Sequence, residues 1–117
     1  IELAGRRHFG HVFFKGPKSD TAVEEVRPVI ENGLSALKQL CSFSPYLCGA
    51  NFSYADIVAH NSFGYCNMAT QAIYGWDIVA AVPGLGDSLA KTAARKTTQK
   101  VDADLAAAMQ AFMAAQG

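Results

Sequence analysis

The pattern of apolar and polar positions predicts helices along the whole chain. Leucine-rich and alanine-rich stretches recur without the sustained alternation of a strand, and twenty residues are alanine. We expect a first helix over residues 1–14 and a breaker-rich loop over residues 16–20. A second helix is expected to start near Thr21, because Thr21 and Glu24 have the spacing of a capping box. Its apolar positions lie three or four residues apart on one face: Val23, Val26, Ile30, Leu34, Leu37 and Cys41.

The strongest local signal lies in the middle of the chain. Ser53 and Asp56 have the spacing of an N-cap residue and its capping-box partner, and Phe52 and Ile57 flank them as a hydrophobic staple. The helix expected over residues 54–74 is apolar on nearly all sides, which is typical of a buried helix. The predicted fold class is therefore an all-α helical bundle around a central buried helix.

Two further helices are expected toward the C-terminus. Pro83 suits the first position of a helix that ends near residue 94. Asp102 and Asp104 are expected in the opening turn of a last helix, where negative charge is favourable against the helix dipole. The apolar face of that helix comprises Val101, Leu105, Met109 and Phe112.

Composition restricts the class of protein. The 117 residues suit one domain spanning 1–117, and 50% hydrophobic with 17% charged residues excludes a disordered chain. Ten basic residues balance ten acidic ones, so we expect neither a nucleic-acid partner nor an anionic membrane surface. No apolar run approaches the roughly 18–20 residues of a transmembrane helix.

The first residue bears on the origin of the chain, and the cysteines bear on the cellular compartment of the protein. Ile1 opens no signal peptide and already lies in a helical pattern, which predicts a domain excised from a longer parent. Three cysteines at wide spacing do not suggest a disulfide framework, and we interpret them as reduced thiols of the core or of turns. A cytoplasmic location follows as an expectation.

An ordered set of short motifs runs along the chain from residue 45 to residue 101. In chain order the segments are Pro45-Tyr46-Leu47-Cys48-Gly49, Phe52-Ser53-Tyr54-Ala55-Asp56, Val82-Pro83-Gly84-Leu85, Ala94-Arg95 and Gln99-Lys100-Val101. Together they resemble the C-terminal helical domain of the cytosolic glutathione transferases, which has a Tyr-Leu-x-Gly turn and then Phe-Ser/Thr-x-Ala-Asp at its central helix. The family's Pro-x-Leu helix start and Ala-Arg-Pro-x-x-Gln-x-Val stretch follow, although Lys96 stands where the family usually has Pro.

The resemblance implies a two-domain parent enzyme of detoxification. A thioredoxin-like N-terminal domain would bind glutathione and supply the catalytic Tyr, Ser or Cys, so no catalytic residue is expected in this chain. The helical domain would form one wall of the pocket for a hydrophobic electrophile, to which the parent would add glutathione. It would also support a homodimer. Glutathione would be a co-substrate, and no cofactor is expected.

The resemblance also places the first helix against the electrophile pocket. Arg7, His8 and His11, with the neighbouring Val12, are therefore candidates for binding the second substrate, and ordinary surface or interface residues are the alternative. His8 and His11 lie about one turn apart and could share a metal ion. A zinc site needs three or four ligands, however, and nothing in the sequence completes one, so no metal is expected.

The central helix supplies the remaining candidates. The resemblance points a residue near Tyr65 toward the electrophile, and Val58 and Asn61 share its face of the helix. A tyrosine packed in the core with its hydroxyl hydrogen-bonded is the alternative. His60 is interpreted as packed against its neighbours, and Ser53 and Asp56 as structural residues.

A different class of function remains open. Domains of this shape are also appended to translation factors and synthetases, where they act as protein-interaction modules without transferase activity. An intact glutathione-binding motif upstream would favour the enzyme, and its loss would favour the module.

Overall fold

The computed structural model describes residues 1–116 and confirms the all-α fold. No strand occurs among these residues. The helices in chain order are α1 (Glu2–Gly5), the 3-10 helix η1 (Arg6–His8), α2 (Phe9–Phe14), α3 (Asp20–Leu40), α4 (Tyr54–Tyr74), α5 (Leu85–Ala93) and α6 (Lys96–Gln116).

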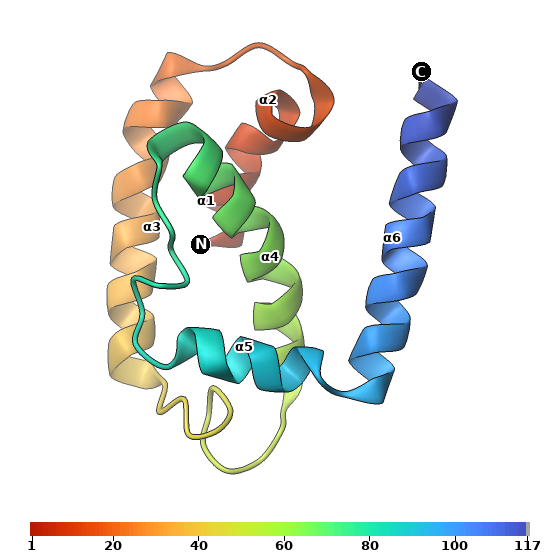
Figure 1. Ribbon diagram of the computed structural model, residues 1–117. Coiled ribbons are helices and arrows are strands. Elements are labelled where there is room, and N and C mark those ends of the chain that lie inside the picture. The colour runs from red at the N-terminus through yellow and green to blue at the C-terminus, as the bar shows by residue number, and fades with distance from the viewer. Residues whose placement is uncertain (117) are drawn as a thin grey trace.

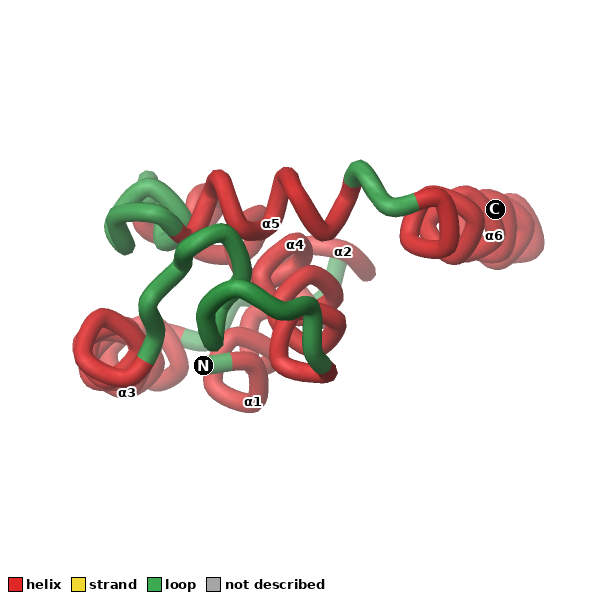
Figure 2. Tube along the Cα trace, turned by 90° about the horizontal axis from the view of Figure 1, so that it is seen from below, coloured by secondary structure: helices red, strands yellow, loops and turns green. Residues whose placement is uncertain are grey.

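The helix α4 occupies the centre of the arrangement. It packs against α1, η1 and α2 on one side and against α5, while α3 runs along the outside of the bundle. Figure 1 shows α5 crossing one end of the bundle and α6 rising apart from it, and Figure 2 shows the same separation from below. The core is a continuous cluster of apolar side chains, among them Val26, Ile30, Leu34, Phe63, Cys66, Ile78, Val82 and Leu85.

The first predicted helix consists of three consecutive pieces. A 3-10 turn at Arg6–His8 separates α1 from α2, so the chain over residues 1–14 is helical but not one regular helix. Gly5 allows a close approach to α4, because a Cβ atom there would lie 2.8 Å from the Sγ atom of Cys66.

The capping box predicted at Thr21 and Glu24 is wrong. The helix begins earlier, because Ser19 adopts an extended conformation and its hydroxyl accepts a hydrogen bond from the Ala22 amide at 3.2 Å. The predicted stripe is otherwise observed, since Val26, Ile30 and Leu34 are buried and Val23, Leu37 and Cys41 are partly buried. The helix continues through Pro28.

The predicted position of Pro83 is also wrong. Gly84 is the N-cap residue of α5 and Leu85 its first residue, so Pro83 lies in the preceding turn. Gly84 has a left-handed conformation with φ +85, and a Cβ atom there would lie 2.9 Å from that of Phe43. The turn that contains Phe43 and Pro45 is held to α5 by Ser88, whose hydroxyl donates to the Pro45 carbonyl at 2.9 Å.

The last helix begins before the predicted acidic turn. The Arg95 amide bonds to the Thr92 carbonyl and the Gln99 amide to the Arg95 carbonyl, so the chain re-enters a helix at Lys96 without a proline. Asp102 and Asp104 consequently lie inside α6 and not in its opening turn.

Burial was expected on nearly all sides of α4, but only one side of the helix is buried. That side consists of Asp56, Ala59, Phe63, Cys66, Ala69 and Thr70. Apolar residues on other sides of the helix remain exposed, with 86% of Tyr54, 61% of Val58 and 55% of Met68 accessible. Of these residues, Met68 lines a hollow between α4 and α6.

Candidate functional site

The start of α4 is fixed by a buried carboxylate. Ser53 and Asp56 form the predicted capping box. One oxygen of Asp56 accepts hydrogen bonds from the Ser53 amide at 2.9 Å and the Ser53 hydroxyl at 3.1 Å, and the other accepts from the Leu47 amide at 2.9 Å. The last bond, which the sequence did not suggest, ties the preceding turn to the helix.

The two residues of the predicted staple line one pocket. Phe52 and Ile57 both contribute to its wall. The Phe52 ring packs edge-on against Tyr46 at 5.6 Å and under the guanidinium of Arg95, whose central carbon lies 3.7 Å from the ring centroid. A mutual contact between Phe52 and Ile57 stays a prediction.

Two of the candidate residues on α4, Asn61 and Tyr65, meet in a groove beside α6. The groove has a volume of about 320 Å³. Its lining comprises His60, Asn61, Gly64, Tyr65, Met68, Asp102, Leu105 and Ala106. Both walls are largely apolar, so the groove suits an uncharged molecular surface.

The ring of Tyr65 is held in place by aromatic neighbours. It packs edge-on against Phe13 at 5.8 Å and at a tilt against Phe9 at 6.3 Å. The Asn61 amide donates to the Ile57 carbonyl one turn back at 2.8 Å, so its nitrogen is satisfied within the helix while the residue also lines the groove. The structure therefore brings Tyr65 and Asn61 together.

Val58 lies in a different depression. It lines a hollow of about 470 Å³ together with Ile1, Leu37, Tyr54 and others, and it does not line the groove beside α6.

His8 lies in the interior. It is 3% exposed, and its Nε2 atom lies 2.8 Å from the Tyr74 hydroxyl, which itself donates to the Val23 carbonyl at 3.0 Å. Because that hydroxyl has one proton, His8 Nε2 must donate to its oxygen. Burial lowers the pKa of His8, and the nearby charge of Arg7 acts in the same direction.

The other candidates on the first helices point elsewhere. Arg7 forms an ion pair with Glu25 at 2.8 Å. The Nδ1 atom of the exposed His11 donates to the Gly16 carbonyl at 2.9 Å and so holds the following loop, while Val12 is partly buried. None of these residues lines the groove beside Tyr65. Their role in substrate binding stays a prediction, as does that of Val58, Asn61 and Tyr65.

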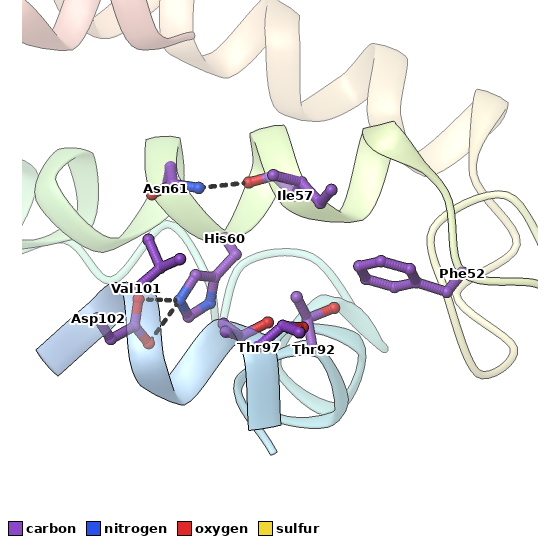
Figure 3. A pocket seen from close by; sticks show the side chains of 9 residues that line it. Phe52, Ile57, His60, Asn61, Thr92, Thr97, Val101 and Asp102 are labelled. Atoms are coloured by element: carbon purple, nitrogen blue, oxygen red, sulfur yellow. Dashed lines mark hydrogen bonds and ion pairs between the residues drawn. The ribbon is translucent and has the colours of Figure 1, made fainter. Parts of the chain in front are cut away.

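A pair of residues that the sequence did not single out joins α4 to α6. His60 Nε2 lies 3.0 Å and 2.9 Å from the two carboxylate oxygens of Asp102 (Figure 3). The interpretation of His60 as packed against its neighbours missed this contact, because the two residues are 42 positions apart and no local pattern links them.

Metal and thiol chemistry find little support in the described residues. Over residues 1–116, no group of three or more His, Cys, Asp or Glu side chains could hold a metal ion. The thiols of Cys41, Cys48 and Cys66 are free, and burial raises the pKa of Cys66 and Cys41. A raised pKa leaves less of the reactive thiolate at neutral pH. None of the helices described here is long and apolar enough to cross a membrane.

Comparison with protein families gives one match. Residues 20–87, more than half of the chain, match the family model described as "Glutathione S-transferase, C-terminal domain". This range runs from the start of α3 to the first turn of α5 and includes the capping box. A comparison with curated proteins found no match.

Proposed function

The chain belongs to the glutathione S-transferase C-terminal domain family, and from this premise we propose that it is the electrophile-binding half of a glutathione transferase. The parent would add the thiolate of glutathione to a hydrophobic electrophile. A thioredoxin-like domain of the parent would bind glutathione and activate its thiol. The observation that carries this proposal is the family match over residues 20–87.

We assign the second substrate to the groove beside α6, because the groove brings together two of the candidate residues, Asn61 and Tyr65. Its apolar walls would exclude water and orient an uncharged aromatic or aliphatic group. Tyr65 presents a ring already held by Phe9 and Phe13, so little side-chain freedom would be lost on binding.

The assembly and the compartment belong to the same proposal. We expect the parent to be a homodimer, which its mass in solution would test. A cytoplasmic location is supported by the three free thiols, since the cytoplasm keeps cysteines reduced.

The test is conjugation of glutathione to an aromatic halide by the full-length parent. Turnover is expected, and Tyr65→Ala should raise KM for the halide while leaving KM for glutathione unchanged. Tyr54→Ala is the matched control, because Tyr54 also lies on α4, is largely exposed and does not line the groove.

Two outcomes contradict the proposal in different ways. A folded parent that neither binds glutathione nor turns over the halide would overturn the enzyme and favour the protein-interaction module. Equal KM values for the halide in the Tyr65→Ala and Tyr54→Ala variants would leave the transferase activity unchallenged. They would overturn the assignment of the groove to the second substrate.

A further inference from the structure

A second, smaller pocket lies on the other side of the His60–Asp102 pair. It is bounded by α4, α5 and α6 and has a volume of about 160 Å³. Phe52, Ile57 and Val101 form its apolar walls. An apolar protein cavity of about 150 Å³ is known to hold a benzene ring. The volume thus suits a molecule with one ring.

One wall of this pocket is preorganised. Phe52 is held by the Tyr46 ring and by the Arg95 guanidinium. A side chain already held by its neighbours loses little rotamer freedom when a ligand contacts it.

The pocket also contains a buried hydroxyl with no partner. Thr92, on α5, is 1% exposed and lines the pocket, and its Oγ1 atom has no hydrogen-bond partner among the described residues. In the view of Figure 3, Thr92 lies between the His60 ring and the Phe52 ring. An unsatisfied buried hydroxyl is unfavourable, because it has lost its hydrogen bond to water without gaining another. A ligand that supplied a hydrogen-bonding group here would remove that cost.

The charge around the pocket selects a neutral ligand. An ionised carboxylate only accepts hydrogen bonds, so His60 Nε2 carries a proton toward Asp102. The Asp102 carboxylate lies in the wall and the Arg95 guanidinium lies against Phe52, so charges of both signs flank the pocket. Neither sign of ligand charge is therefore favoured over a neutral ligand.

We propose that the pocket between α4, α5 and α6 binds a neutral, single-ring aromatic alcohol, that is, a molecule of the phenol class. The ring lies in the space between Phe52 and Val101. The hydroxyl group forms a hydrogen bond with Thr92 Oγ1. This pocket is distinct from the groove of Tyr65 and Leu105, and the proposal does not depend on transferase activity.

The test is a titration of the full chain with phenol, followed by two-dimensional amide NMR. Toluene, which has the same ring without the hydroxyl, and benzoate, which adds a negative charge, are titrated in parallel. Saturable shifts are expected at the amides around Phe52, Ile57 and Val101. Thr92→Val keeps the side-chain shape and removes the hydroxyl. This variant should weaken the affinity for phenol about five- to tenfold, which corresponds to one neutral hydrogen bond, and it should leave the affinity for toluene unchanged.

A second pair of variants tests the location. Val101→Phe fills the pocket and should abolish binding of both phenol and toluene. Leu105→Phe is the matched control, because Leu105 lies one turn further along α6 and lines the groove instead. Should Val101→Phe fail to fold, the comparison of Thr92→Val with the unsubstituted chain decides alone.

Three results would overturn the proposal. They are the absence of saturable phenol binding, equal phenol affinity in the Thr92→Val variant, and phenol-induced shifts confined to amides away from this pocket. Benzoate binding as tight as that of phenol would overturn the assignment to neutral ligands.

Discussion

Replacement of Asp56 by alanine should destabilise the fold by about 3 kcal/mol. The side chain is fully buried and accepts three hydrogen bonds, of which two come from the backbone amides of Leu47 and Ser53. In the Asp56→Ala variant both amides lose their partner, at about 1 kcal/mol or more each, and the loss of the helix cap adds a similar amount. For a domain of this size the melting temperature should fall by about 15 °C.

Thermal unfolding followed by far-ultraviolet circular dichroism measures this effect. Asp87→Ala is the matched control, because Asp87 is an exposed aspartate in the first turn of α5 and its loss should cost less than about 1 kcal/mol. Asp56→Asn should fall between the two, since one amide oxygen can serve only one of the two positions that the carboxylate fills. If the Asp56→Ala and Asp87→Ala variants have the same melting temperature, the buried carboxylate does not hold the start of α4 and the reasoning is refuted.

Three further tests address other parts of the structure. Burial lowers the pKa of His8 below its unfolded value near 6.5, so the unfolded chain binds the proton first as the pH falls. The stabilisation is therefore complete above pH 6.5 and is lost as the pH decreases toward the folded pKa. Denaturant titrations at several pH values should show a shallower pH dependence for His8→Phe, and an unchanged slope would contradict this. Gly5→Ala should cost about 1–3 kcal/mol because its Cβ atom would meet Cys66, whereas Gly64→Ala meets nothing within 4 Å and should stabilise the helix by about 0.5–1 kcal/mol. Thermal melting measures both, and equal effects would argue against the close approach of α1 to α4. Asp102→Ala should speed hydrogen exchange in α6 by removing its tie to α4, while Asp104→Ala, which loses only a pair within α6, should not. Equal exchange rates in the two variants would show that the tie does not hold α6.

The parts of the fold that local chemistry determines could be predicted from the sequence. The bounds of α4 agree with the prediction because a capping box marks its start and Gly75, in a left-handed conformation, follows its end. The stripe along α3 could be found because burial repeats with the period of the helix. Both signals lie within a few residues of the feature that they specify.

Neighbouring residues with similar propensities were harder to separate. Ser19 and Thr21 are both good N-cap residues, and the extended conformation of Ser19, which the sequence does not reveal, decides which of them begins α3. Pro83 and Gly84 present the same difficulty at α5. There the close approach of Phe43, from a turn 41 residues earlier, suits a residue without a side chain at the cap.

Contacts between distant positions could not be predicted in the same way. His8 meets Tyr74 across 66 residues and His60 meets Asp102 across 42, and each pair joins elements whose spacing depends on the folded core. The sequence identified Tyr65 and Asn61 as candidates through the family resemblance, but it could not indicate that α6 forms the facing wall.

The position of α6 explains why the period of the apolar residues was a poor guide to burial in α4 and α6. A hydrophobic pattern shows that a side of a helix avoids water, but it does not show which surface covers it. Here the His60–Asp102 pair and the edge-on contact of Phe14 with Phe112 at 6.2 Å tie α6 alongside the bundle. Side chains rather than direct helix packing thus set the width of the space between α4 and α6. Substitutions at these ties should therefore change the groove and the pocket more than they change the core.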